Sequence, residues 1–154
     1  MKKIGKYEIV REIGQGATSN VYLGRDPFAQ RDVAVKVVFP QVLKDPERGK
    51  LYTHLFLNEA SLVGKLNHPH IVQIFDAVVA DALCYIVMEY VPGGTLEAFC
   101  AEQKLLPVSR VVEIIFKCTR ALDFANRLGI THRDIKPANI LIVGGDAQTG
   151  DIKI

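Results

Sequence analysis

The chain has 154 residues and a formal net charge of +2, and 49% of its residues are apolar. This composition suits one folded domain with a real core and argues against intrinsic disorder. The near balance of charge gives no reason to expect a nucleic acid or an anionic membrane as the main partner.

Three short apolar runs open the chain, and turn residues separate them. The runs are Tyr7–Ile13, Val21–Arg25 and Val33–Val38, with Gly14 and Gly16 in the first break and Asp26-Pro27 in the second. Short β-branched runs joined by tight turns predict an antiparallel meander.

A helix and two further strands follow. Phe56, Ala60, Val63 and Leu66 recur at helical spacing, which predicts a helix from about Gly49 to Leu66 that Asn67-His68-Pro69 ends. Two more apolar runs, 71–79 and 83–91, predict strands. Pro92-Gly93-Gly94 then predicts a flexible break, which divides the chain into lobes at 1–91 and 92–154.

The second lobe reads mainly as helix. A short helix is predicted over 95–102, and Pro107 opens a long helix that Gly129 ends. One face of the long helix is expected to be buried, formed by Val111, Ile115, Cys118, Leu122 and Ala125. The runs 140–143 and 151–154 predict two paired strands joined by a turn. The whole is an α+β pattern in two lobes, with a cleft expected between them.

A glycine-containing loop is the first feature that indicates chemistry. It reads Gly14-Gln15-Gly16-Ala17-Thr18-Ser19-Asn20-Val21 and joins two predicted strands. Glycine lets backbone N–H groups approach phosphate oxygens without a Cβ in the way. The loop does not open a helix, which argues against a dinucleotide-binding fold. Taken alone, such a loop is more often an ordinary hairpin turn.

Two charged residues complete a candidate phosphate site in this lobe. Lys36 lies on the apolar strand 22 residues after Gly14, where a cation could reach phosphates held under the loop. Glu59 lies at the edge of the buried face of the predicted helix and could hold Lys36 by an ion pair. Each residue alone would be read as an ordinary exposed side chain.

The segment His132-Arg133-Asp134-Ile135-Lys136-Pro137-Ala138-Asn139 lies between the long helix and an apolar strand. A carboxylate such as Asp134 can orient a hydroxyl nucleophile and accept its proton. Lys136 can neutralise charge on a transferred phosphoryl group, and the Asn139 amide oxygen suits Mg²⁺. A polar surface loop is the alternative interpretation of this segment.

In this order and spacing, the glycine loop, the VAVK strand, the helical Glu59 and the HRDIKPAN segment resemble the protein kinase family. The resemblance covers nearly the whole chain, and Lys136 is typical of its Ser/Thr-specific branch. It implies an ATP-dependent transferase that phosphorylates Ser or Thr hydroxyls of proteins, with ATP and Mg²⁺ as cofactors. The expected fold is a five-stranded antiparallel N-lobe with one helix, followed by the first helices and the catalytic loop of a partial C-lobe.

The resemblance also implies a role for each matching residue. Lys36 would bind the α- and β-phosphates and pair with Glu59, while Val21, Ala34 and Leu141 would enclose adenine. Met88 would gate the back of the pocket, and the backbones of Glu89 and Val91 would bind the adenine edge. Asp134 would be the catalytic base, Lys136 the phosphoryl stabiliser, Asn139 a Mg²⁺ ligand and His132 a packed structural residue. The phosphates would be covered by the loop residues Ile13, Gly14, Gln15, Gly16, Ala17, Thr18, Ser19, Asn20 and Val21.

The chain departs from the family pattern at two places. Ser19 stands at the third glycine position, where a side chain is expected to stiffen the loop tip. The chain also stops at Ile154, before the DFG segment whose Asp holds the main Mg²⁺ in the family. We therefore expect little or no kinase activity from this chain alone, and an apolar face on the second lobe that favours association.

Two alternatives to a protein kinase stay open at this point. A nucleotide-binding or regulatory module without catalysis would share the same motifs, and the residues after Ile154 would distinguish it. Phosphotransfer to a small molecule on a related fold is disfavoured by the complete HRDIKPAN run.

Cellular location is predicted from three observations. The three cysteines, Cys84, Cys100 and Cys118, have no metal-binding or disulfide spacing, which suits a reducing cytosol. Neither a signal peptide nor an apolar run long enough to span a membrane is evident in the sequence. We expect a cytoplasmic location, with a membrane anchor downstream of these residues left open.

Overall fold

A computed structural model describes residues 2–44, 49, 53–54, 56, 64–80 and 83–154. These residues form two compact units, one of Met1–Lys65 with Gln73–Tyr90 and the other of Leu66–Val72 with Val91–Ile154. The sequence placed the division after residue 91 and assigned 66–72 to the first lobe. In the structure, the backbone N–H of Val72 donates to Ile154 O at 2.9 Å, and that of Ile154 donates to His70 O at 2.9 Å. These bonds attach the 66–72 segment to the second unit.

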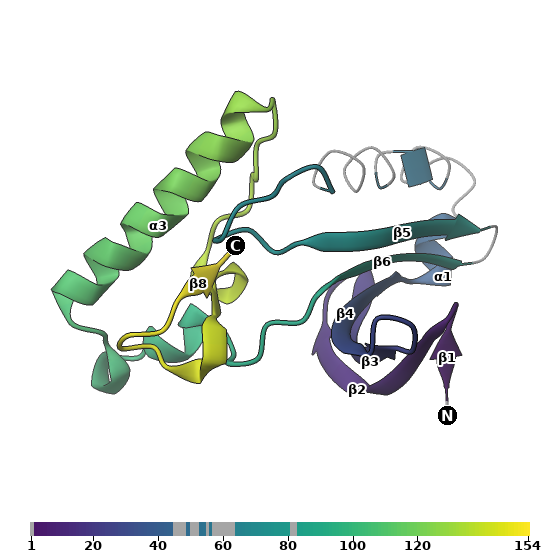
Figure 1. Ribbon diagram of the computed structural model, residues 1–154, viewed down its shortest axis with the longest axis horizontal. Helices are drawn as coiled ribbons and strands as arrows, with labels where there is room; N and C mark the ends of the chain where they lie inside the picture. Colours follow the sequence, from purple (N-terminus) through teal and green to yellow (C-terminus); the bar gives the residue numbers. More distant parts are fainter. Residues whose placement is uncertain (1, 45–48, 50–52, 55, 57–63, 81–82) are drawn as a thin grey trace. The chain divides into compact units, whose positions relative to one another are not determined.

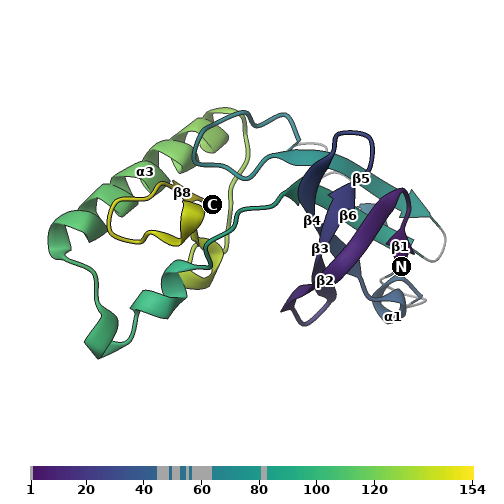
Figure 2. The same ribbon diagram turned by 60° about the horizontal axis from the view of Figure 1, so that its bottom comes forward.

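The first unit is a curled sheet of six antiparallel strands in the order β1-β2-β3-β4-β6-β5 (Figures 1 and 2). The five expected strands are present, and the addition is β1, a two-residue strand that pairs Ile4 with Tyr7. A short helix, α1 (Pro40–Leu43), follows the fourth strand. The strands span β1 Lys3–Ile4, β2 Tyr7–Gln15, β3 Ser19–Asp26, β4 Arg31–Val38, β5 Ile74–Ala80 and β6 Leu83–Glu89.

The two faces of this sheet carry separate apolar clusters because side chains alternate along each strand. Val33 and Val35 of β4 pack with Tyr7, Tyr85 and Val87 on one face. The opposite face carries Val38, Phe56, Cys84 and Ile86. The even-numbered residues of β4, including Ala34 and Lys36, therefore share a face with Val38.

The helix expected over 49–66 lies mostly outside the described residues. Those that are described between 49 and 56 are helical, and the Thr53 hydroxyl donates to Gly49 O at 2.9 Å. Gly64 and Lys65 form a turn, so the helix ends before the predicted Leu66. Glu59, the expected partner of Lys36, lies outside the described residues.

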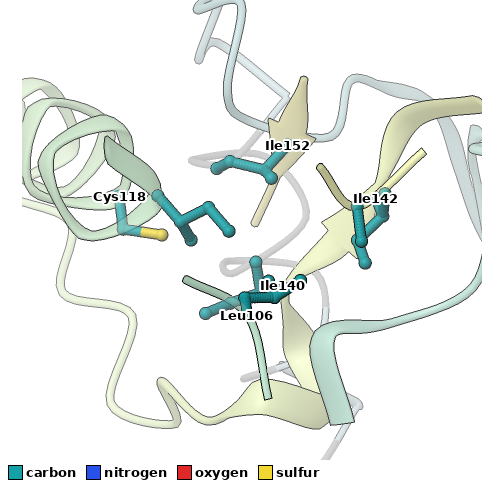
Figure 3. Close-up of a cluster of buried hydrophobic side chains, with 7 residues drawn as sticks. Leu106, Cys118, Ile140, Ile142 and Ile152 are labelled. Atoms are coloured by element: carbon teal, nitrogen blue, oxygen red, sulfur yellow. The ribbon is translucent and has the colours of Figure 1, made fainter. Parts of the chain in front are cut away.

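The second unit is built around α3 (Val108–Arg127) and a short hairpin of β7 (Leu141–Ile142) and β8 (Ile152–Lys153). Ile114 and Cys118 of α3 pack in one cluster with Ile142 and Ile152 of the hairpin. Figure 3 shows Cys118, Ile142 and Ile152 of this cluster. The region expected as one short helix over 95–102 is instead two 3₁₀ turns. The 3₁₀ segments are η1 Leu96–Phe99, η2 Glu102–Lys104, η3 Pro137–Asn139 and η4 Val143–Gly145.

The ends of α3 agree with the sequence to within one residue. Pro107 is the N-cap, so the first helical residue is Val108 and not Pro107. Gly129 follows the C-cap Leu128 with a φ of 77°, a left-handed conformation that favours glycine.

The buried face of α3 was predicted wrongly at two positions. The predicted Val111 and Ile115 are 37% and 58% exposed, whereas Ile114 is 2% exposed. Cys118 and Ala125 are buried as expected. Apolar residues cover so much of the first half of this helix that their spacing did not select one face. The buried residues are Arg110, Ile114, Cys118, Ala121 and Ala125.

The apolar surface expected on the second lobe is present along α3. Val108 is 80% exposed, and Val112 and Phe116 are 59% and 61% exposed. The predicted state of the thiols is also confirmed, because all three cysteines are free and Cys84 and Cys118 are buried. Within the part of the chain that the structure describes, no helix is both long and apolar enough to cross a bilayer.

The Pro92-Gly93-Gly94 break is held by hydrogen bonds and is not a loose linker. The backbone N–H groups of Gly144 and Ile142 donate to Pro92 O at 2.8 Å and to Gly94 O at 3.0 Å. Gly93 has a φ of 137°, and a Cβ there would lie 2.0 Å from Ile142 O. Only glycine permits this close approach, so the segment is fixed against the hairpin of the second unit.

Candidate functional site

The predicted site residues are divided between the two units. Ile13 to Val21, Ala34, Lys36, Met88 and Glu89 belong to the first unit, and Val91, Asp134, Lys136, Asn139 and Leu141 belong to the second. Each half is therefore described by itself.

The glycine loop is a closed hairpin between β2 and β3. Gly14 pairs with Val21, and Gln15 pairs with Asn20. Within the loop, the Gly16 N–H donates to Ser19 O at 2.8 Å. From outside it, the N–H of Phe39, which follows β4, donates to Thr18 O at 2.9 Å. A Cβ on Gly16 would lie 3.3 Å from Ser19 O, which explains why glycine fits there. In this conformation, the Gly16 N–H is used inside the loop.

Ser19 does not lie at the loop tip, where the sequence placed its side chain. It is the first residue of β3, pairs with Val38 of β4, and is 5% exposed. The exposed tip is formed by Ala17 and Thr18. Any effect of Ser19 on the loop must therefore act through the packing of the strand and not through the tip itself.

Four predicted nucleotide-binding side chains share one face of the sheet. Lys36 is paired with Val21 on one side and with Ile86 on the other. Ala34 is paired with Met88 in the same way. Because directly paired residues point to the same face, Val21, Ala34, Lys36 and Met88 form one surface. Lys36 is exposed on it, although its flanking residues Val35 and Val37 pack into the opposite face.

The backbone of Glu89 is partly committed to the sheet. Its N–H donates to Gln73 O at 2.8 Å, and its carboxylate accepts from the Gln73 N–H at 3.3 Å. The next predicted contact, Val91, lies across the division between the units.

Asp134, Lys136 and Asn139 lie together on the second unit. The Lys136 ammonium is 3.0 Å from Asp134 Oδ2. The Asn139 side-chain amide donates to the same oxygen and to Asp134 O, each at 2.8 Å. Asp134 is exposed, so this cluster is open to an incoming hydroxyl. The turn that joins these residues ends in η3, which carries Asn139.

The electrostatics of the cluster keep Asp134 ionised. Hydrogen bonds from Lys136 and from Asn139 hold the pKa of the Asp134 carboxyl below its ordinary value. The neighbouring Arg133 has a φ of 64°, a conformation that side chains rarely adopt. With the backbone of Arg133 in this conformation, the Asp134 N–H lies 3.3 Å from His132 Nδ1. The half-buried His132 thus contacts the loop backbone.

Leu141 follows this loop directly at the start of β7. It pairs with Lys153 of β8 and bridges to Thr95. Ile140, between Asn139 and Leu141, is 7% exposed and belongs to the core of the second unit (Figure 3). Ile142, on the other side of Leu141, is fully buried. The half-buried Leu141 therefore lies between two core residues.

The residues present fit a metal ion that arrives with phosphate. Both hydrogen bonds of the Asn139 side chain use its amide nitrogen, which leaves the amide oxygen as an acceptor for a hard cation. Among the described residues, no group of three or more His, Cys, Asp or Glu side chains could hold a metal ion. An amide oxygen suits Mg²⁺, which keeps water and phosphate oxygens among its ligands.

Arg110 is a feature of the second unit that the sequence did not single out. It is 4% exposed, and it binds the turn between β7 and β8. The signal in the sequence was weak, because a charged residue in the first turn of a surface helix is normally solvated.

Comparisons with known proteins agree with the resemblance of the motifs. A family model described as a protein kinase domain matches residues 7–154. The serine/threonine-protein kinase PknB of Mycobacterium leprae is 40% identical over 146 residues, which are 92% of this chain and 23% of that protein. The serine/threonine-protein kinase PrkC of Bacillus subtilis is 38% identical over 150 residues, which are 97% of this chain and 22% of that protein.

The solved kinase domain of PknI from Mycobacterium tuberculosis also matches, with a TM-score of 0.80 and 32% identity. That match covers 99% of this chain and 60% of the solved domain. The chain therefore spans less than a quarter of the length of these two curated relatives and about three fifths of the solved domain.

Proposed function

The chain belongs to the protein kinase domain family, and from this premise we propose that it supplies the nucleotide-binding and catalytic-loop residues of a Ser/Thr protein kinase. The reaction would move the γ-phosphoryl group of Mg-ATP to a Ser or Thr hydroxyl of a protein substrate. The observation that carries the proposal is the contact of Asp134 with both Lys136 and Asn139.

Asp134 would orient the substrate hydroxyl and receive its proton. Its lowered pKa keeps it an acceptor at neutral pH, which favours orientation of the hydroxyl over strong basicity. Lys136 lies next to it and would neutralise the charge on the transferred group. Since Lys136 is bound to Asp134 in the structure, substrate binding would redistribute its contacts from the carboxylate to the phosphoryl oxygens.

The first unit would hold the nucleotide. Val21, Ala34 and Met88 form an apolar surface beside Lys36, which suits an adenine ring next to a phosphate-binding cation. The loop amides would face the phosphates only after the Gly16 N–H leaves Ser19 O. When bound, Mg²⁺ supplies neutralisation of phosphate charge, and Asn139 would provide an oxygen ligand for it.

The test is transfer of labelled phosphate from ATP to a generic basic protein. Because the chain spans 60% of a solved kinase domain, we expect little transfer from the chain alone and transfer from a protein in which it is followed by the rest of such a domain. In that longer protein, Asp134→Asn should lower kcat by about 10²- to 10⁴-fold.

The matched control is Asp123→Asn, which changes an exposed carboxylate of α3 in the same unit. It should leave kcat within about twofold of the wild type, since its ion pair with Arg127 is exposed. An Asp134→Asn variant that keeps full activity would refute the proposed role of Asp134. A longer protein that binds ATP without any transfer would indicate a non-catalytic module instead.

A further inference from the structure

Arg110 is a buried arginine at the third residue of α3, and the kinase mechanism above makes no use of it. Its side chain is 4% exposed. Burying a guanidinium costs free energy unless its donors find acceptors. The contacts that offset this cost show what Arg110 holds in place.

The acceptors are backbone carbonyls in the turn between β7 and β8. Arg110 Nε donates to Ala147 O at 2.8 Å, and Nη2 donates to Gly150 O. These partners lie 37 and 40 residues away in sequence. The remaining nitrogen, Nη1, lies 2.8 Å from Glu113 Oε2 on the same helix. The planar fork of arginine can reach two carbonyls at once, which a lysine cannot do in the same geometry.

The turn that Arg110 binds is itself tightly organised. Asp146 Oδ1 accepts from the backbone N–H groups of Gln148 at 2.9 Å and Thr149 at 3.3 Å. The Gly150 N–H donates to Asp146 O at 2.8 Å, and a Cβ on Gly150 would lie only 2.3 Å from that same oxygen. A rigid turn can transmit the position of its anchor to the two strands that leave it.

A second anchor lies two helical turns further along α3. Lys117 Nζ is 2.8 Å from Glu113 Oε1 and 3.1 Å from Asp151 Oδ1, and Asp151 is the residue before β8. Arg110 and Lys117 are seven residues apart and hence on the same face of the helix, about 10 Å from each other. The hairpin is therefore fixed to α3 at its turn and at the start of β8.

The other arm of the hairpin leads straight into the candidate catalytic residues. The Val143 N–H donates to Asp151 O at 2.8 Å, and Ile142 pairs with Ile152, so β7 follows the placement of β8. Asn139 is separated from β7 by Ile140 alone. We propose that Arg110 is a positioning residue for Asn139, acting through the turn 146–150 and the β7–β8 hairpin. The expected effect on Mg²⁺ binding rests on the proposed function. The expected effect on the position of Asn139 does not.

The first experiment needs no ligand. Arg110→Met keeps an unbranched apolar stem and removes both carbonyl contacts, while Arg110→Lys keeps the charge. Proton–nitrogen NMR spectra of the chain report the Thr149 and Gly150 backbone amides and the Asn139 side-chain amide. We expect Arg110→Met to shift or broaden all three signals and Arg110→Lys to do so less. Arg127→Met, at an exposed position of the same helix, should change none of them.

The second experiment compares the affinity of the chain for ATP with and without Mg²⁺ by calorimetric titration. Arg110→Met should weaken Mg-ATP binding by roughly tenfold, as loss of a supporting contact to a metal site does. In the presence of a chelator, the affinity of Arg110→Met for ATP should differ from that of the wild type by less than about twofold. The reason is that the expected contacts to the base and the phosphates lie largely on the first unit.

The outcomes separate the two claims. If the turn amides change while the Asn139 amide does not, Arg110 has only a local structural role and the inference is wrong. An equal loss of affinity with and without Mg²⁺ would also overturn it. If the wild-type chain binds no ATP but the Asn139 signal responds to Arg110→Met, the positioning role is supported and the nucleotide-binding part of the proposed function is the one that fails. Gly150→Ala, which disturbs the turn from its own side, should reproduce the changes of Arg110→Met.

Discussion

Ile114 and Ile115 are neighbours on α3 with opposite environments, at 2% and 58% exposure. The hydrophobic periodicity of the sequence selected Ile115 as a core residue, whereas the structure selects Ile114. Replacing each by alanine in turn removes the same atoms from the same helix. The pair of variants therefore measures which face of α3 is buried, with little interference from other differences.

The expected magnitudes follow from burial. Ile114 packs with Cys118, Ile142 and Ile152, so Ile114→Ala removes buried methyl groups and leaves a cavity, at a cost of about 3 kcal/mol. If the free energy of unfolding falls by about 1.5 kcal/mol per molar urea, the urea midpoint of Ile114→Ala should be about 2 M lower than that of the wild type. Ile115→Ala should change stability by less than about 0.5 kcal/mol, since alanine also has the higher helix propensity.

The assay is urea unfolding followed by circular dichroism at 222 nm, to which α3 contributes as the long helix of the second unit. Hydrogen exchange of the α3 amides would locate the effect within that unit. Sedimentation velocity should accompany both variants, because Ile115 belongs to an exposed apolar surface that could associate. If Ile115→Ala costs as much as Ile114→Ala in a monomeric sample, the assignment of the buried face is refuted.

Two further predictions concern His68 and Ser19. The pKa of His68 is lowered, mainly because the ring is buried and further because His70 and basic residues lie near it. Its Nδ1 accepts a hydrogen bond from the His70 N–H at 3.1 Å. The folded state binds this proton less readily than the unfolded chain, so the stabilising contribution is present above the ordinary pKa of about 6.5 and is lost as the pH falls through the lower folded value. Thermal melts should show a smaller loss of Tm between pH 7 and 5 in His68→Asn than in the wild type, and identical pH profiles would contradict the reasoning. Ser19→Gly should leave ATP affinity unchanged or slightly higher and cost up to about 1 kcal/mol of stability, because glycine weakens a strand; a large loss of affinity in a calorimetric titration would reveal a specific contact of Ser19.

Much of the candidate site could be predicted because its parts are local in sequence. Asp134, Lys136 and Asn139 lie within six residues, so one turn is enough to bring their side chains together. The shared face of Ala34 and Lys36 follows from the alternation of side chains along a strand. The motif order then identified the family, and the comparisons confirm it.

The failures of prediction have different physical causes. The boundary between the units was misjudged for 66–72, because its hydrogen bonds to Ile154 join residues about half the chain apart and leave no local signal. Pro92-Gly93-Gly94 was read as flexible, yet Gly93 permits close contact with Ile142 and Gly145. The same residue type serves flexible linkers and tight packing, and only the neighbours decide between them.

By itself, the sequence determined which residues are candidates for the chemistry, since residue type and short spacing set what a loop can bind and which strand face a side chain takes. Only the tertiary structure decided which face of α3 is buried and which groups the guanidinium of Arg110 binds. A helix with apolar residues on several sides could bury any of them, so its buried face is set only when it packs against a partner surface. A buried guanidinium is tolerated only where distant carbonyls, here those of Ala147 and Gly150, meet it in the folded chain.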